Sequence, residues 1–427
     1  MVLLRKVVAA CVALPLLGGL ASAEEKTLTV WMTDSRTQYK TWLEDAAAEY
    51  KKQNPDISIK VVQMAPNDAY VKWPSSVAAG NTPDITWMFF AYAGWLHDLP
   101  GGGFAPMDDV VAELGKDKFE EASLAAWNYK DSYIGVPYTK QPFYLFWRKD
   151  LFEAAGLSAP KTWTDVVNAA KVLNKPDQGQ FGITIGGKND WTVRQNFEVV
   201  LYSNGGHLLS KTGEPAFAGP EAMDALRIYS ELFKNTPPGG LAAGYTEVNR
   251  TFAQGAAAMA ISLPVALSQF YEANPDKAGQ VGAVIPSDEG LALTMQNNKG
   301  WAVFKNSPNV DEAKDFIKFL YTSDQYAGAL ASAAFGWMPL YKDPAAIERF
   351  FTASDVTKAF PDAVDALLAP ASGYYAGIDW FGQNPNGGEV GSSGLVEHNL
   401  NSFLAGQISA EATAENIQNG LGKIFRK

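Results

Sequence analysis

Cysteine and histidine are almost absent from this sequence. It has one cysteine, Cys11, and three histidines among 427 residues. Cys11 lies in an apolar N-terminal segment that we expect to be removed, which would leave neither a disulfide nor a thiol nucleophile. His97, His207 and His398 are far apart, and none is paired at the spacing of a metal-binding motif. The sequence therefore predicts no metal site and no cofactor.

Long apolar runs are also lacking, since no stretch reaches the ~18 consecutive apolar residues of a membrane helix. The apolar run 7–20 follows Arg5 and Lys6 and precedes Ala21-Ser22-Ala23, a pattern typical of a cleaved signal peptide spanning 1–23. An uncleaved anchor is an alternative. A lipoprotein signal at Cys11 is disfavoured because few apolar residues separate it from Lys6. We expect an exported, periplasmic protein.

Basic charge is in deficit. The net charge is −11, and loss of Arg5 and Lys6 with the leader makes it −13. Such a surface repels nucleic acid and anionic membranes, so we expect neither as a partner.

The chain begins with an alternation of strand and helix patterns. Residues 26–31 alternate as a strand, 37–52 carry a helical apolar stripe, and 57–62 form a second strand pattern. A βαβ unit implies a parallel sheet, and ligands bind beyond the carboxyl ends of such strands. Thr33, Asp34 and Arg36 follow the first strand and are candidate ligand contacts. The alternative is that they only begin a surface helix.

A third strand follows Pro83-Asp84, and most of its residues, 85–92, are large and apolar. Such a strand is buried on both faces. Trp87, Phe90 and Tyr92 are nearest its carboxyl end and could contact ligand. The alternative is that they belong to the core.

Three junctions resemble passages of the chain between two domains. The first, 135–142, runs from an apolar strand through two prolines into a second apolar run, and it offers Tyr138, Lys140 and Gln141. The others are the polar-to-apolar boundary at Gly300-Trp301 and the kinked passage at Trp337. The alternative for the first is a strand, a kinked turn and a second strand within one core.

Further candidates lie in the second half of the chain. Trp191 begins a helix after a turn, and Asn204-Gly205 ends that helix. Tyr374 lies in a segment, 372–393, that is rich in glycine and aromatic residues. Aromatic rings beside polar side chains would suit a ligand with both apolar faces and hydroxyl groups, because an unpaired hydroxyl costs ~1–3 kcal/mol.

Several stretches together resemble the family 1 extracellular solute-binding proteins of bacterial carbohydrate ABC importers, the family of maltose-binding protein. They are Asn81-Thr82-Pro83-Asp84-Ile85, Gly135-Val136-Pro137-Tyr138, the block 145–157 with its Lys149-Asp150-Leu151-Phe152, the pattern Phe252, Gly255, Ala258-Met259, and the strand-plus-helix segment 303–320.

The resemblance implies an α/β fold of two lobes, each a mainly parallel sheet flanked by helices, with ligand held in the cleft between them. It implies crossings near 138–141, 299–303 and 337–340. The N-terminal lobe would comprise 24–137 plus 302–338, and the C-terminal lobe 142–299 plus 341–427. It further implies a monomer that binds a carbohydrate, closes on it by hinge motion, and delivers it to ABC permease subunits in the inner membrane.

The sequence departs from the maltose-type pattern at two acidic positions. Ala91 or Tyr92 and Lys140 or Gln141 stand where those relatives have carboxylates. The ligand is therefore expected to differ from maltose: a mono- to trisaccharide or a glycoside, with an acidic or sulfonated sugar as an alternative because Arg36, Lys140 and Arg194 are near the expected cleft.

Two other functional classes remain open. A secreted glycosidase needs two carboxylates about 5–10 Å apart, and chance pairs are unavoidable among 46 acids. Ser158 and Lys161 match a Ser-x-x-Lys motif, but Pro160 between them disfavours the required helix start. A receptor of the same fold without a transport role is the third possibility. We expect a binding protein rather than an enzyme.

Overall fold

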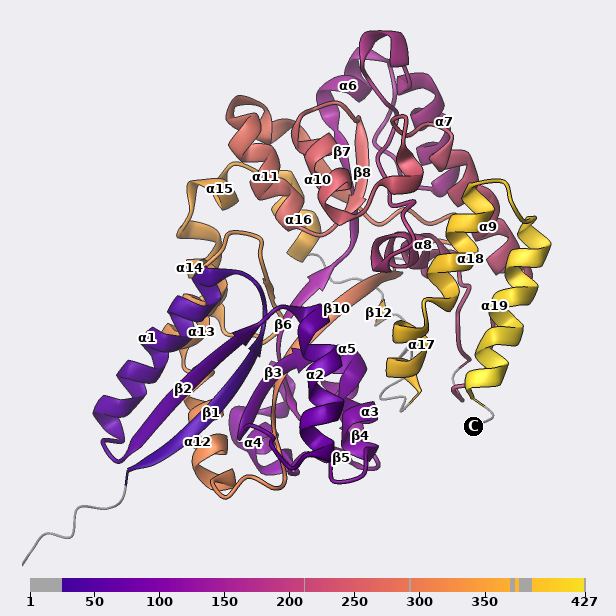
Figure 1. Cartoon of the computed structure of the whole chain (residues 1–427). Helices are drawn as coiled ribbons and strands as arrows, with labels where there is room; N and C mark the ends of the chain where they lie inside the picture. The colour runs from indigo at the N-terminus through magenta and orange to yellow at the C-terminus, as the bar shows by residue number, and fades with distance from the viewer. Residues whose placement is uncertain (1–24, 211, 292, 369–372, 376–385, 426–427) are drawn as a thin grey trace, which may run out of the picture.

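The computed structural model describes residues 25–210, 212–291, 293–368, 373–375 and 386–425. The expected signal peptide, 1–23, lies outside the described residues. Two α/β lobes lie side by side (Figure 1), so the expected two-lobed α/β fold is confirmed. Within the described ranges, every helix is too short or too polar to cross a membrane.

The first lobe is organised around a mixed sheet with the strand order β11-β6-β10-β3-β1-β2, and β12 pairs with β10. The predicted βαβ unit forms: β1 (Lys26–Thr33) pairs in parallel with β2 (Ile57–Met64) and β3 (Ile85–Phe89), and α1 (Thr37–Gln53) connects β1 to β2. One face of α1 is buried, including Tyr39 and Trp42, as the helical stripe requires. The carboxyl ends of β1 and β3 point towards the second lobe.

The remaining elements of the first lobe cover this sheet. They are α2 (Pro66–Ala78), η1 (Phe90–Tyr92), α3 (Ala93–Asp98), α4 (Asp108–Leu114), η2 (Lys116–Lys118), α5 (Glu121–Ala125), the hairpin β4 (Asn128–Tyr129) and β5 (Ser132–Tyr133), α12 (Val310–Leu320) and α13 (Ser323–Ala331).

Three strands carry the chain along the junction between the lobes. β6 (Val136–Pro142) and β10 (Leu293–Val303) pair antiparallel, and the short β11 (Met338–Pro339) pairs with β6. All seven residues of β6 are buried, which explains why the first predicted junction is so apolar. One residue after β6, the chain enters β7 (Tyr144–Arg148) of the second sheet.

The second lobe contains a three-stranded sheet, with β7 between β8 (Met259–Ser262) and β9 (Val281–Val284). Both pairings are antiparallel, so the expectation of a mainly parallel sheet is wrong here. β7 continues the chain directly from β6 of the first lobe, and it runs opposite to both β8 and β9. Near this sheet, Phe181 and Thr184 each form a single parallel bridge, with Ala257 and Ala260 respectively.

Helices surround the second sheet. They are α6 (Lys149–Ala154), α7 (Trp163–Leu173), η3 (Pro176–Gln178), α8 (Trp191–Ser203), α9 (Pro220–Phe233), η4 (Gly240–Ala242), α10 (Tyr245–Ala253), α11 (Val265–Ala273), η5 (Pro275–Gln280), α17 (Gly387–Ser393), α18 (Leu395–Leu404) and α19 (Ala410–Ile424). Thr162 caps α7 in a capping box with Asp165.

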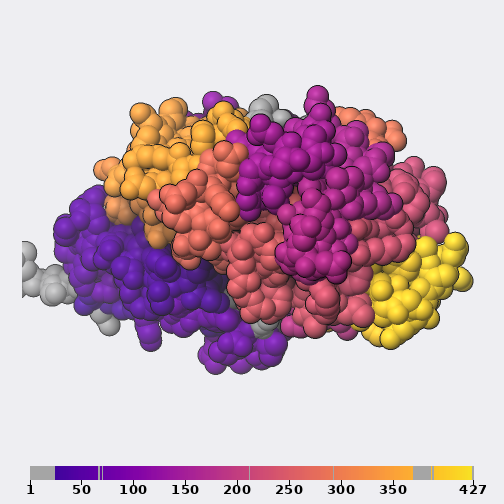
Figure 2. All heavy atoms as spheres, turned by 90° about the horizontal axis from the view of Figure 1, so that it is seen from above, coloured from indigo at the N-terminus to yellow at the C-terminus, as the bar shows by residue number. Residues whose placement is uncertain are grey.

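The helices α14 (Pro344–Thr352), α15 (Asp355–Lys358) and α16 (Pro361–Leu368) pack against both lobes. α14 packs on α13 of the first lobe, and α16 packs on β9 of the second. Figure 2 shows this orange segment beside the indigo first lobe and next to the magenta second lobe. Phe350 and Phe360 belong to a core that also contains Phe146 of β7, so apolar packing is continuous between the lobes on this side.

Candidate functional site

A cavity of about 850 Å³ lies between the lobes, where the carboxyl ends of β1 and β3 face α8, α10 and α18. Its volume is within the usual range for small-molecule sites. Aromatic side chains form much of its wall: Phe89, Phe90, Tyr92, Trp95, Trp191, Tyr245 and Trp337. Six charged residues also line it: Asp34, Arg36, Asp190, Arg194, Lys299 and Glu397.

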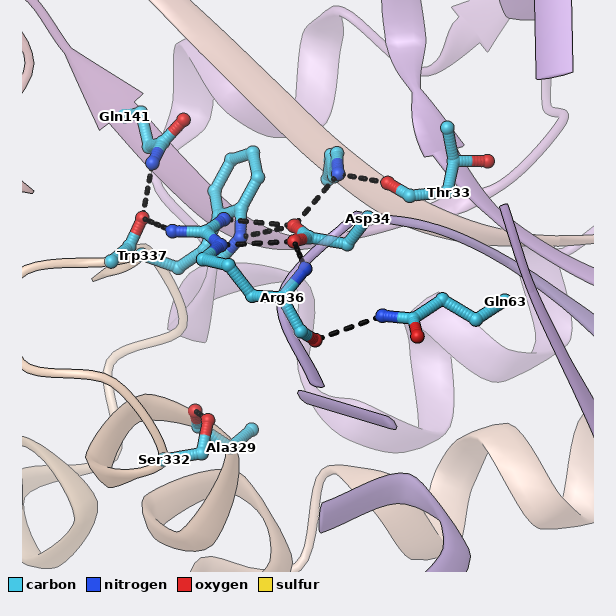
Figure 3. A network of polar contacts seen from close by, with 10 residues as sticks. Thr33, Asp34, Arg36, Gln63, Gln141, Ala329, Ser332 and Trp337 are labelled. Carbon is cyan, nitrogen blue, oxygen red and sulfur yellow. Dashed lines mark hydrogen bonds and ion pairs between the residues drawn. The ribbon is translucent and has the colours of Figure 1, made fainter. Parts of the chain in front are cut away.

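The Asp34 carboxylate is the centre of the first-lobe wall (Figure 3). Its Oδ1 accepts hydrogen bonds from the Arg36 backbone N (3.0 Å) and Nε (2.9 Å). Its Oδ2 accepts from Arg36 Nη2 (2.8 Å), Trp337 Nε1 (3.0 Å) and Lys299 Nζ (3.2 Å). Burial alone would raise the pKa of Asp34, but the two cations hold it well below its ordinary value. Asp34 is therefore ionised, and its acceptor sites are occupied.

Lys299 is fully buried on β10 and enclosed by three aromatic rings. Its Nζ lies 4.9 Å from the ring centre of Trp87, 4.4 Å from Phe89 and 4.6 Å from Trp337, and it donates to the Thr33 carbonyl. Burial lowers the pKa of Lys299 to about 8, against the opposing effect of Asp34. The carboxylate and the ring faces thus hold a cation in an otherwise unfavourable position.

The same cluster connects the three junction strands to β1. Arg36 Nη1 donates to the Gly336 carbonyl (3.0 Å), and Gln141 Nε2 donates to that same oxygen. The Gln63 amide in turn donates to the Arg36 carbonyl (2.9 Å). Figure 3 shows Gln141 and Arg36 both reaching the Gly336 carbonyl, next to Trp337. Because β6, β10 and the segment before β11 all contribute, the position of this wall depends on the geometry of the junction.

A second charged cluster lies on the opposite side of the cavity, where Arg194 and Glu397 belong to the wall. Arg194 of α8 donates from Nε to Glu397 Oε1 of α18 (2.6 Å) and from Nη1 to Glu198 Oε1 (3.1 Å). Glu198 is fully buried, and burial raises its pKa. Glu397 is 4% exposed, and its Oε2 accepts no hydrogen bond from any described residue.

Trp191 and Tyr245 form an aromatic surface at the start of two helices. Their ring centres are 5.3 Å apart. Asp190 caps α8 by accepting from Thr192 N (2.9 Å), which fixes where Trp191 enters the cavity. Gln195 Nε2 donates to Asn297 Oδ1 (3.2 Å), so an amide pair joins α8 to β10 beside this surface.

The structure brings seven of the sixteen predicted site residues to the cavity wall. They are Asp34, Arg36, Phe90, Tyr92, Gln141, Trp191 and Trp337. Tyr374 lies in β12 (Gly373–Tyr375), and its side chain is outside the described part of the chain. The other eight do not line the cavity: Thr33, Trp87, Tyr138, Lys140, Asn204, Gly205, Gly300 and Trp301.

The aromatic residues among those eight are core residues behind the wall. Trp87 and Trp301 are opposite each other on β3 and β10, with stacked rings 5.4 Å apart, and Tyr138 packs on Trp301 at 5.6 Å. All three are at most 1% exposed. β3 is buried on both faces, as the sequence predicted, so a ring on it need not face ligand.

Lys140 and Gln141 are separated by strand geometry. Successive side chains of a strand point to opposite faces. Gln141 reaches the cavity, whereas Lys140 pairs with Glu120 at 2.7 Å at the start of α5.

The other predicted residues lie away from the cavity because of where the backbone places them. Thr33 is fully buried and offers its carbonyl to Lys299. Asn204 and Gly205 terminate α8, 13 residues long, at the end opposite Trp191, a separation of roughly 20 Å. Gly300 packs against Trp127 and the Val136 carbonyl.

Four residues that line the cavity were not predicted from the sequence: Lys299, Glu397, Tyr245 and Trp95. Lys299 had a usable signal, because it lies two residues after Asn297, on the same face of the strand that contains Gly300 and Trp301. Glu397 had none, because α18 is far along the chain and reaches the cavity only through the tertiary fold. Among the described residues, no group of three or more His, Cys, Asp or Glu side chains is arranged to hold a metal ion.

Comparison with known proteins agrees with this architecture. Residues 33–327 match the family described as bacterial extracellular solute-binding protein. A mannitol-binding protein of Pseudomonas aeruginosa is 29% identical over 264 residues, 60% of this chain and 58% of that protein. A lactose-binding protein of Rhizobium radiobacter is 24% identical over 332 residues, 75% and 76% of the two chains.

A solved structure gives the same result for the whole fold. The ABC transporter solute-binding protein of Agrobacterium radiobacter K84 in complex with ribitol has a TM-score of 0.75 and 26% identity, covering 94% of this chain and 99% of that one. The proteins compared are binding proteins rather than enzymes. The family match spans more than half of the sequence, and the chain therefore belongs to the bacterial extracellular solute-binding proteins.

Proposed function

We propose that this protein is the periplasmic substrate-binding component of an ABC importer, and that it binds a small sugar, glycoside or polyol in the inter-lobe cavity. The observation that carries the proposal is a cavity whose wall combines aromatic rings with fixed polar groups contributed by both lobes. Relatives named for mannitol and lactose, and a similar structure containing ribitol, support a ligand rich in hydroxyl groups.

Recognition would use the two kinds of surface together. The rings of Trp191 and Tyr245 offer flat apolar area to the C–H faces of the ligand. The Gln195–Asn297 amide pair and the carboxylate of Asp190 offer hydrogen bonds to hydroxyls. These groups belong to the second lobe and to the junction, whereas Arg36 and Trp337 line the cavity on the side of the first lobe. A ligand that contacts both sides therefore favours closure of the lobes. The closed form would then deliver the ligand to permease subunits in the inner membrane.

A glycosidase is the weaker alternative. It needs one carboxylic acid with a raised pKa beside a second carboxylate. In this cavity the pKa of Asp34 is lowered by Arg36 and Lys299. Glu198, whose pKa burial raises, does not line the cavity.

A binding screen tests the proposal. Purified protein, unfolded and refolded to remove any co-purified ligand, is incubated with mannitol, ribitol, tagatose, lactose, maltose and galacturonate. We expect at least one compound to raise the melting temperature and to change tryptophan fluorescence, since Trp191 and Trp337 line the cavity. Absence of both signals with every compound would contradict the proposal, and hydrolysis of a disaccharide would support the enzyme.

A further inference from the structure

Glu397 lines the cavity, and one of its carboxylate oxygens has no hydrogen-bond partner among the described residues. Its Oε1 is held by Arg194 Nε at 2.6 Å, whereas its Oε2 is buried and accepts no hydrogen bond from the described residues. A buried oxygen without a donor is destabilising, and more so when it carries charge. Because Glu397 lines the cavity, a ligand bound there can supply the missing donor once the side chains adjust around it.

The orientation of this carboxylate is fixed before ligand arrives. The bond to Arg194 joins α18 to α8, and Glu198 holds the other side of the guanidinium at 3.1 Å. Arg194 and Glu397 are both more than 90% buried. A buried group held by a charge-assisted hydrogen bond loses little freedom when ligand binds.

The cations of the cavity are already paired with carboxylates. Arg36 and Lys299 both bind Asp34, and Arg194 binds Glu397 and Glu198. An acidic sugar would have to compete with these carboxylates, and its negative charge would meet an uncompensated oxygen at Glu397. A neutral hydroxyl donates to that oxygen without such repulsion.

We propose that Glu397 is a specificity-determining residue, whose Oε2 accepts a hydrogen bond from a ligand hydroxyl and thereby selects neutral sugars or polyols over acidic ones. This inference rests on the proposed function, and it names the class of ligand for the same cavity. It decides against the acidic or sulfonated sugar that the lysine and arginine residues had suggested.

The test compares Glu397→Gln with Glu198→Gln. Both remove one negative charge beside Arg194, but only position 397 belongs to the cavity wall. Affinities are measured by calorimetry for a neutral probe and its acid counterpart, galactose with galacturonate and mannitol with mannonate. Thermal melts confirm that each variant is folded.

We expect Glu397→Gln to weaken binding of the neutral probe at least tenfold and to reduce the preference for neutral over acidic ligand, with a smaller effect of Glu198→Gln on both. Equal effects of the two variants would overturn the inference and leave Glu397 only a support for Arg194. A Glu397→Gln affinity within threefold of wild type would also overturn it. If wild-type protein binds no probe, the proposed function fails and the inference fails with it.

Discussion

Replacement of Asp34 by Asn removes the charge on which the first-lobe wall depends. The carboxylate accepts five hydrogen bonds, from Arg36, Lys299 and Trp337. An asparagine has one acceptor oxygen, and its NH₂ group would face donors. Lys299, fully buried, would lose its only carboxylate partner among the described residues.

The expected loss of stability follows from the buried ion pair. Breaking such a pair by removing one partner costs about 3–5 kcal/mol, because the other charge stays buried. We therefore expect Asp34→Asn to lower the free energy of unfolding by at least ~3 kcal/mol in urea titrations. The double variant Asp34→Asn, Lys299→Met should recover part of this loss, because it removes the unpaired cation.

A surface ion pair provides the control. Asp109 pairs with Lys314 at 2.9 Å, and the Asp109 side chain is 65% exposed. Asp109→Asn should cost less than ~1 kcal/mol. A loss below ~1 kcal/mol for Asp34→Asn, or no recovery in the double variant, would refute the view that Asp34 neutralises buried Lys299.

Three further predictions concern pH, the cavity rings and the junction. The pKa of Lys299 in the folded protein, about 8, is below its ordinary value of 10.5, so the unfolded chain binds more protons between pH 8 and 10.5. The stability of wild type relative to Lys299→Met should therefore rise over this pH range. A stability difference that is constant with pH would contradict this. Trp191→Ala should weaken ligand binding by at least ~1 kcal/mol with little change in melting temperature, whereas Trp337→Ala, which removes a buried ring, should cost ~3–5 kcal/mol of stability in urea. An unchanged affinity in Trp191→Ala would mean that the Trp191 ring is structural and does not contact ligand. Gly300→Ala places a Cβ 2.4 Å from the Val136 carbonyl and 2.6 Å from Trp127. It should therefore lower the free energy of unfolding by ~1–3 kcal/mol in urea titrations. An unchanged free energy of unfolding would contradict the view that the junction is tightly packed at this position.

Local pattern predicted much of the first lobe. The alternation in 26–31 and the helical stripe in 37–52 match β1 and α1, and the Pro-Asp start matches β3. These elements are set by nearby residues, and the carboxyl ends of β1 and β3 reach the cavity as the sheet rule requires.

The ligand-facing side chains were harder to predict because burial and tertiary contacts decide them. Trp87 and Phe90 look alike in sequence, yet Trp87 packs on Trp301 while Phe90 lines the cavity. Lys140 and Gln141 are neighbours on opposite faces of β6. The direction of β7 and the approach of Glu397 to Arg194 depend on how distant segments meet, which no local pattern encodes.

Calorimetric titration of the ligand-free protein with neutral sugars and polyols tests the central claim most directly. We predict one saturable site per chain for at least one such compound, with weaker binding in Trp191→Ala. Absence of binding heat with every neutral sugar and polyol, or binding that Trp191→Ala and Glu397→Gln both leave unchanged, would contradict it.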